Sequence, residues 1–141
     1  MQLKRYTDFS LRILIYLGVN PNRIVSINEI ADAYDISRNH LLKVVNGLME
    51  QELIQTFRGK SGGLQLAKPA RKINVGEVVK YMEGDVQLID CQEPYCPILP
   101  ACNLKRALNE ANQGFYKILG SYTLEDLIKG KENKLVRLLA G

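Results

Sequence analysis

The sequence contains no tryptophan, one histidine, three cysteines and only 7% aromatic residues among its 141 positions. An odd number of cysteines argues against a framework of disulfides. No stretch approaches the roughly 20 consecutive apolar residues of a membrane-spanning helix, and residues 1–6 lack the apolar core of a secretory signal. We therefore expect a cytoplasmic protein with no membrane contact. The length excludes a large multidomain enzyme, and 46% apolar residues suffice to bury the core of one domain.

The positive charge is concentrated in the first part of the chain. The net charge of +4 divides into 12 Lys/Arg against 7 Asp/Glu in residues 1–80, and 7 against 8 in residues 81–141. Within residues 37–72 the basic residues are Arg38, Lys43, Arg58, Lys60, Lys68, Arg71 and Lys72, against two acidic ones. Such an excess is typical of a surface that binds a polyanion, although an ordinary solvated surface has the same composition.

A helix-turn-helix is predicted in this basic region. Ser26 and Glu29 have the S-x-x-E spacing of a capping box, and a short helix follows. After a break of about two residues, Ser37 is a good N-cap for a further helix that extends to about Gln51. Two helices joined by so short a break, the second with a polar outer face, are typical of a DNA-binding helix-turn-helix.

The second of these helices is predicted to have one apolar and one polar face. Its inner face is expected to contain Leu41, Leu42, Val45, Leu48 and Met49. The residues expected to contact base edges and phosphates in a major groove are Ser37, Arg38, Asn39, His40 and Lys43. For His40, capping or a phosphate contact is favoured over a metal ligand. A preceding apolar helix, capped by Thr7 and ending at Asn20, is expected to be largely buried.

A glycine-rich hairpin follows the helix-turn-helix. Residues 53–57 and 64–67 alternate like short strands, and the tip between them reads Arg-Gly-Lys-Ser-Gly-Gly. We interpret it as a wing whose Arg58, Lys60 and Ser61 contact phosphates or a minor groove. The alternative is an ordinary hairpin that uses its glycines only for the turn. With a helix near residues 76–83, residues 1–84 are predicted to form a mainly α-helical winged helix-turn-helix domain with a small β-hairpin wing.

The three cysteines lie in a proline-containing loop, residues 85–102, with the spacing Cys91-x4-Cys96-x5-Cys102. This spacing is wider than that of a zinc knuckle or a thioredoxin-like motif. It favours an iron-sulfur site that lacks one thiolate ligand, over a thiol redox switch or a structural zinc site. Because no histidine lies near the loop, a nucleophilic enzyme is not favoured.

Residues 103–141 are predicted to form a dimerisation helix and a tail. The apolar positions that recur every three or four residues are Ala101, Leu104, Leu108, Ala111, Phe115, Ile118 and Tyr122. This seam is typical of a helix that pairs with its counterpart in a dimer, although packing on the chain's own body gives the same pattern. Thr123 is expected to cap a short further helix, and the tail through Leu139 is expected to return to the core.

Four segments carry a resemblance to a known family. They are residues 6–12 (YTDFSLR), residues 37–43 (SRNHLLK), residues 58–64 (RGKSGGL) and the cysteine segment followed by Leu104 and Lys105. Together they resemble the small winged-helix iron-sulfur transcription regulators, which include IscR and CymR. The combination is most similar to the nitric-oxide-sensitive repressors of that family. IscR-like members usually have another cysteine spacing and a histidine after the last cysteine, where this chain has Asn103.

The resemblance implies a non-enzymatic homodimer that binds a palindromic operator in double-stranded DNA. It implies an iron-sulfur cluster, 4Fe-4S rather than 2Fe-2S, whose destruction by nitric oxide releases the DNA. It also implies Asp8, reaching across from the partner subunit, as the fourth ligand; a first-turn acid that stabilises its own helix is the alternative. Competing donors are Asp90, Glu93 and Asn103. Alternative functions are an IscR-like sensor of iron-sulfur supply, a CymR-like regulator without a cluster, and an iron-sulfur electron-transfer or accessory protein.

Overall fold

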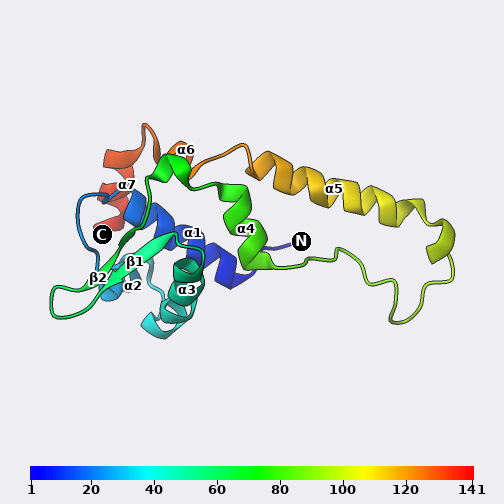
Figure 1. Ribbon diagram of the computed structural model, residues 1–141, viewed down its shortest axis with the longest axis horizontal. Helices are drawn as coiled ribbons and strands as arrows, with labels where there is room; N and C mark the ends of the chain where they lie inside the picture. The colour runs from blue at the N-terminus through cyan, green and yellow to red at the C-terminus, as the bar shows by residue number, and fades with distance from the viewer.

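The computed structural model describes all residues, 1–141, as a helical body with a small hairpin and one projecting helix (Figure 1). The body contains α1 (Arg5–Gly18), α2 (Ile27–Tyr34), α3 (Arg38–Glu50), β1 (Ile54–Phe57), β2 (Gly63–Leu66), the short helix η1 (Ala70–Lys72) and α4 (Val75–Glu83). The second half contains η2 (Leu99–Ala101), α5 (Asn103–Leu119), α6 (Leu124–Ile128) and α7 (Glu132–Leu139). The predicted fold class, mainly α-helical with a β-hairpin wing, is confirmed. None of the helices combines the length and apolar character that crossing a membrane requires.

Helix α5 extends away from the body. The loop after α4 runs outward to the far end of α5, and α5 then returns the chain to the body (Figure 1). At the returning end the chain continues into α6, which packs on α1 and places Leu124 in the core. Thr123 caps α6 with a complete capping box, as expected, and α7 adds Leu139 at the edge of the core. The loop is therefore attached to the body directly at its start, and at its end only through α5 (Figure 1).

The core forms around α1. Ile13, Leu14 and Leu17 are buried there against the inner faces of α2 and α3. The predicted start of α1 is wrong, because the helix begins at Arg5 and Thr7 lies inside it. Thr7 is fully buried, and its hydroxyl donates a hydrogen bond to a carboxylate from α4 instead of capping its own helix.

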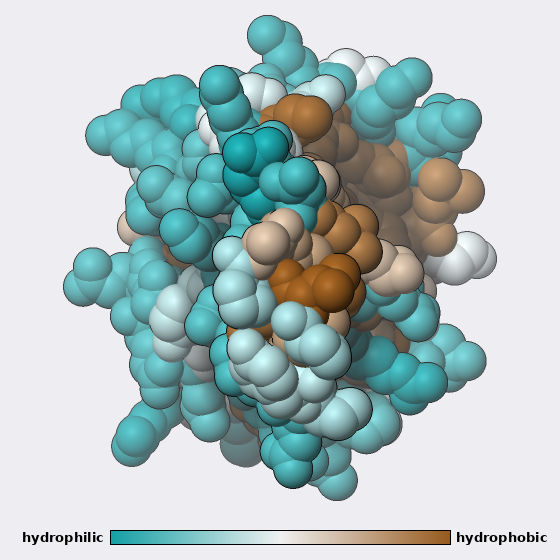
Figure 2. All heavy atoms as spheres, turned by 90° about the vertical axis from the view of Figure 1, so that its right-hand side faces the viewer, coloured by the Kyte–Doolittle hydropathy of each residue, from teal (hydrophilic) through white to brown (hydrophobic).

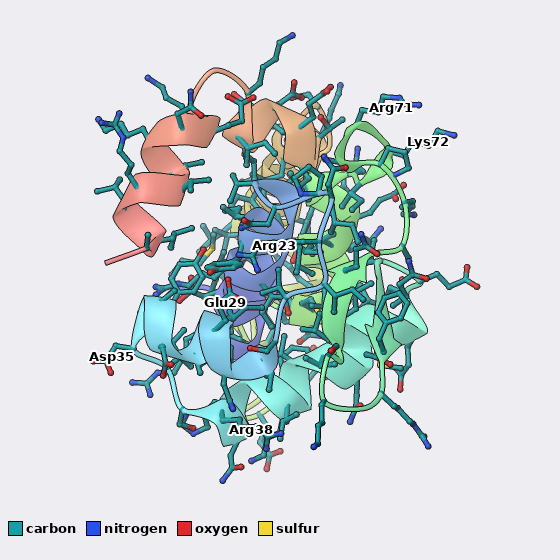
Figure 3. All side chains as sticks on the ribbon, turned by 90° about the vertical axis from the view of Figure 1, so that its left-hand side faces the viewer. Arg23, Glu29, Asp35, Arg38, Arg71 and Lys72 are labelled. Carbon is teal, nitrogen blue, oxygen red and sulfur yellow. The ribbon has the colours of Figure 1, made fainter.

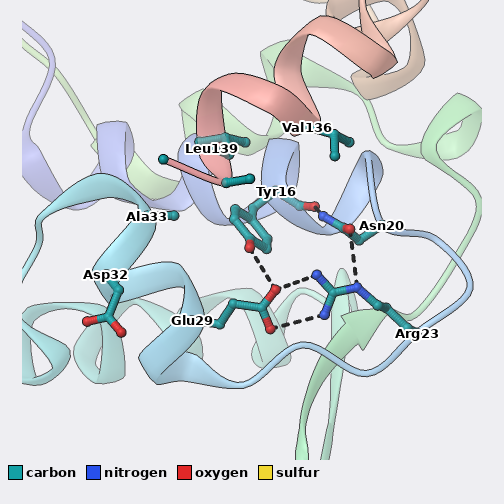
Figure 4. A pocket seen from close by; sticks show the side chains of 10 residues that line it. Tyr16, Asn20, Arg23, Glu29, Asp32, Ala33, Val136 and Leu139 are labelled. Atoms are coloured by element: carbon teal, nitrogen blue, oxygen red, sulfur yellow. Dashed lines mark hydrogen bonds and ion pairs between the residues drawn. The ribbon is translucent and has the colours of Figure 1, made fainter.

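Only one of the two hydrogen bonds of the predicted capping box at the start of α2 is present. The Ser26 hydroxyl accepts the N–H of Glu29 at 3.1 Å. The Glu29 carboxylate does not return to the cap; it accepts hydrogen bonds from the Tyr16 hydroxyl at 2.7 Å and from the guanidinium of Arg23 (Figure 4). The guanidinium is the main reason that the pKa of Glu29 is lowered. A charged donor binds a carboxylate more strongly than a backbone N–H does, so this network replaces the reciprocal cap.

The predicted hairpin is present, with β1 and β2 antiparallel and Ile54 opposite Leu66. Leu64 also bridges to Val25 just before α2, so the hairpin is attached to the helix-turn-helix. At the tip, Gly59 has a φ of 101°, which side-chain-bearing residues rarely adopt. The conformation of the turn is therefore sufficient to require a glycine at position 59.

Helix α5 is shorter than the predicted apolar seam. It begins at Asn103 with Cys102 as its N-cap and ends at Leu119, so Ala101 lies in η2 and Tyr122 lies beyond the helix. Pro100 and Gly120 stand at the two boundaries. The five residues expected to mediate dimerisation all lie within the helix, and they are Leu104, Leu108, Ala111, Phe115 and Ile118.

Candidate functional site

The N-terminal half of α3 presents polar side chains to solvent. Ser37 caps the helix, its hydroxyl accepting the N–H of His40 at 3.2 Å. Arg38, Asn39, His40 and Lys43 are exposed, and the His40 ring lies beside Phe9 of α1, with centroids 6.3 Å apart. Because a helix N-terminus carries partial positive charge, this end of α3 is suited to an anion such as phosphate.

The inner face of α3 differs from the predicted one. Leu41, Val45 and Leu48 are buried as expected, together with Val44. Leu42 and Met49 were expected in the core, but they are 38% and 41% exposed. At 100° per residue the buried stripe is centred between Leu48 and Val44, which turns Leu42 to the opposite side. The outward face of α3 is therefore not purely polar.

The wing carries its basic residues at an exposed tip. Arg58, Lys60 and Ser61 are all exposed, and none of them makes a hydrogen bond or ion pair within the chain. These side chains are thus available to contact the sugar-phosphate backbone.

The basic run of residues 37–72 does not form one continuous face. Arg71 and Lys72 in η1 lie at the opposite end of the body from Arg38 (Figure 3). The basic residues that composition placed in one group therefore do not share a single surface, since Arg71 and Lys72 lie away from α3 (Figure 3). Residues close in sequence were expected to share one face, but the chain crosses the body between β2 and η1 and separates them (Figure 1).

The loop of residues 85–102 contains all three thiols, and none is in a disulfide. Cys91 is buried, whereas Cys96 and Cys102 are partly exposed. The Cys96 N–H donates to the Cys91 carbonyl at 3.0 Å, and the Cys102 sulfur accepts the N–H of Lys105 at 3.4 Å. Within the single chain, no three Cys, His, Asp or Glu side chains are grouped so as to hold a metal ion.

Asp8 lies on α1 and is held by a neighbour on the same helix. Its carboxylate accepts from Arg12 Nε at 2.9 Å, and the side chain is 41% exposed. The Arg12 guanidinium is also 6.0 Å from the Phe9 ring centroid and 5.8 Å from that of Tyr34. Burial raises the pKa of Tyr34 to about 12, so its hydroxyl stays protonated and donates to the Arg12 carbonyl at 3.0 Å. Asp8 is thus an accessible carboxylate in a fixed position.

The competing oxygen donors lie in or next to the cysteine loop. Asp90 already accepts the N–H groups of Gln92 and Glu93 at 2.8 and 3.2 Å, which organises a local turn. Glu93 and Asn103 are exposed.

Two residues at the end of α4 connect the start of the loop to α1 and α3, and sequence reasoning missed both. Glu83 is buried and accepts hydrogen bonds from the backbone N–H of Lys4 and the Thr7 hydroxyl, both at 2.7 Å. The Tyr81 hydroxyl donates to Glu50 at the end of α3 at 2.8 Å, and this bond raises the pKa of Tyr81. Neither has a local sequence signature, because both partners are more than thirty positions away.

Comparison with known families gives a match over nearly the whole chain. Residues 3–130 match the Rrf2 family, described as "Iron-dependent Transcriptional regulator". The chain belongs to the Rrf2 family. Two relatives bear the name "HTH-type transcriptional regulator NsrR". That of Oceanobacillus iheyensis is 46% identical over 96% of this chain and 95% of its own length. That of Bacillus licheniformis is 42% identical over 94% and 96%.

Solved structures of Rrf2-type regulators share the fold. Oxidised CymR of Staphylococcus aureus superimposes with a TM-score of 0.73 at 25% identity, covering 92% of this chain and 97% of CymR. IscR of T. potens gives 0.76 at 21% identity, covering 95% and 90%. The Rrf2 chain is therefore a transcription regulator with a DNA-binding winged helix.

The donor chemistry of the loop fits the iron dependence of the Rrf2 family. Three cysteines within one short segment, none of them in a disulfide, are the ligand type that iron-sulfur clusters require. The single chain does not group these thiols, so holding such a cluster would require the loop to bring them together.

Proposed function

We propose that this Rrf2 protein is a cytoplasmic repressor that binds a palindromic operator as a homodimer and releases it in response to nitric oxide. The observation that carries the proposal is the attachment of the three-thiol loop to the winged-helix domain. Glu83, just before the loop, accepts hydrogen bonds from Lys4 and Thr7 at the start of α1. The similarity to regulators named NsrR supports the same reading.

For DNA binding, α3 is placed in a major groove. Arg38, Asn39, His40 and Lys43 then contact base edges and phosphates, while Arg58, Lys60 and Ser61 of the wing contact the flanking backbone or minor groove. All of these side chains are exposed. In a dimer the two α3 helices must lie about 34 Å apart, or a multiple of it, to enter successive turns.

The second copy is proposed to pair through α5. Leu104 and Ile118 are 60% and 65% exposed, and no residue of α5 is buried. The end of the molecule formed by the loop and the start of α5 shows apolar side chains at its centre (Figure 2). An exposed apolar seam on a projecting helix is stabilised when a matching helix covers it.

Cys91, Cys96 and Cys102 are proposed as the protein ligands of an iron-sulfur cluster, 4Fe-4S in preference to 2Fe-2S, with Asp8 of the partner subunit as the fourth. Such a cluster, when bound, would supply iron that can react with nitric oxide. Asp8 suits the remaining position because its carboxylate is accessible and Arg12 fixes its orientation.

The chain's own residues connect the loop to DNA. The loop begins directly after Glu83, which holds the first turn of α1, and Tyr81 on the same helix end holds the last turn of α3. A loop that changes conformation therefore pulls on the two helices that carry Asp8 and the DNA-contacting face. Between two subunits, the same motion changes the spacing of the two α3 helices.

The test uses anaerobically purified protein. Its visible spectrum is recorded, and binding to a palindromic operator duplex is followed during titration with nitric oxide. Cys96→Ala is expected to lose the visible absorbance and to weaken operator binding by about 5- to 150-fold, the usual range of coupling between two sites. Tyr95→Phe, a change at the preceding position that keeps all three thiols, is the matched control and should behave like the parent protein.

The outcomes separate the parts of the proposal. Tight operator binding by Cys96→Ala contradicts the coupling between loop and DNA. If the protein is coloured but its DNA binding does not change with nitric oxide, nitric oxide is not the signal, and an IscR-like sensor of iron-sulfur supply is favoured. A colourless protein that binds its operator contradicts the cluster and favours a CymR-like regulator.

A further inference from the structure

Leu42 lies on the outward face of α3, toward one edge, and Asn46 is at the centre of that face. Leu42 is 38% exposed, whereas the adjacent Leu41 is fully buried. On the helical wheel, Asn46 and Asn39 lie on one side of Leu42 and Arg38 on the other. A branched apolar side chain that is partly exposed thus lies beside amide and guanidinium groups.

This combination of side chains matches one feature of DNA. In the major groove, the only apolar group on a base edge is the C5-methyl of thymine. Asparagine pairs by two hydrogen bonds with adenine, the partner of thymine, and Arg38 supplies charge for guanine or phosphate. An apolar side chain beside two asparagines therefore complements A·T pairs and has no equivalent partner in G·C pairs.

We propose that Leu42 contacts the C5-methyl of a thymine and is a specificity-determining residue of the operator interaction. The inference rests on the proposed insertion of α3 into a major groove, and it assigns a base type to that site. Binding removes water from both the Leu42 side chain and the thymine methyl group, and this favours thymine over a base without a methyl group.

The experiment starts by selecting bound duplexes from a randomised pool of about 30 base pairs, enough for two half-sites one turn apart, with the anaerobically purified full chain. Each thymine of the selected sequence is then replaced by deoxyuridine, which removes only the methyl group. At one thymine per half-site the affinity should fall about fourfold, or about 15-fold when both half-sites are changed.

The decisive comparison is between proteins. Leu42→Ala, and independently Leu42→Gln, should bind the thymine and deoxyuridine probes with equal affinity, because the methyl then has no partner. Leu127→Ala is the matched control: Leu127 is 37% exposed on α6, at the other end of the body from α3, and the variant should keep the full deoxyuridine effect (Figure 1).

Two results would overturn the inference while leaving DNA binding intact. One is a parent protein that tolerates deoxyuridine at every thymine; the other is a deoxyuridine penalty of the same size in the Leu42 variants. Failure of the parent protein to enrich any sequence would instead remove both the inference and the proposed operator binding.

Discussion

The buried carboxylate of Glu83 offers a quantitative test of how the cysteine loop is attached to the DNA-binding domain. One oxygen, Oε1, accepts both the Lys4 N–H and the Thr7 hydroxyl at 2.7 Å, and Thr7 is fully buried. Replacing Glu83 by Ala removes two hydrogen bonds to a charged acceptor and leaves the Thr7 hydroxyl without a partner. At about 1.5 to 3 kcal/mol for each bond to a charged group, less partial compensation by water, we expect a loss of about 3 kcal/mol.

A second variant separates hydrogen bonding from charge. Glu83→Gln keeps an oxygen that can accept from both donors, so it should lose only the favourable interaction of a negative charge with the N-terminus of α1, about 1 kcal/mol. The free energy of unfolding is measured anaerobically by urea denaturation followed by circular dichroism, at one protomer concentration because pairing affects stability. Equal losses for Gln and Ala, or a loss below about 1 kcal/mol for Ala, would refute the assignment of Glu83 as the shared acceptor.

Two further predictions concern charged groups elsewhere. Glu29→Gln should cost about 1 kcal/mol at neutral pH by weakening the network with Arg23 and Tyr16. The hydrogen bond from Arg23 lowers the pKa of Glu29, so this stabilisation is present above the ordinary value of 4.5 and is lost as the pH falls through the lowered value. Urea midpoints of the two proteins should therefore converge below pH 4.5, and a constant difference would contradict the network. Lys60→Ala should reduce the salt slope of operator binding by about 0.9 per subunit whatever the DNA sequence, whereas Lys129→Ala, at the C-cap of α6, should leave the slope unchanged. A loss of affinity that depends on the DNA sequence would instead mean that Lys60 contacts bases.

Much of the fold could be predicted because its rules are local. Ser26 and Ser37 cap helices at the expected places, since a cap needs only the next three residues. The hairpin and the capping box at Thr123 also depend on near neighbours. Prediction failed where a distant residue competed for the same group. Thr7 has a good capping side chain, but Glu83 from α4 binds its hydroxyl.

The candidate site shows the same division. Exposure of Arg38, Asn39 and Lys43 followed from helical periodicity, which is a property of the chain alone. The rotation of α3 in the core was not predictable to within one residue. Leu41 and Leu42 are the same amino acid at adjacent positions, and only the placement of α1 and the hairpin decides which of them is buried.

By itself, the sequence determined the winged helix-turn-helix, the three-thiol loop and the apolar seam, because residue order fixes spacing and periodicity. Only the tertiary structure decided which charges form a common face, how Glu83 and Tyr81 attach the loop to α1 and α3, and that Leu42 points outward. These features depend on groups far apart in the chain, whose meeting is set by the packing of the whole core rather than by any local pattern.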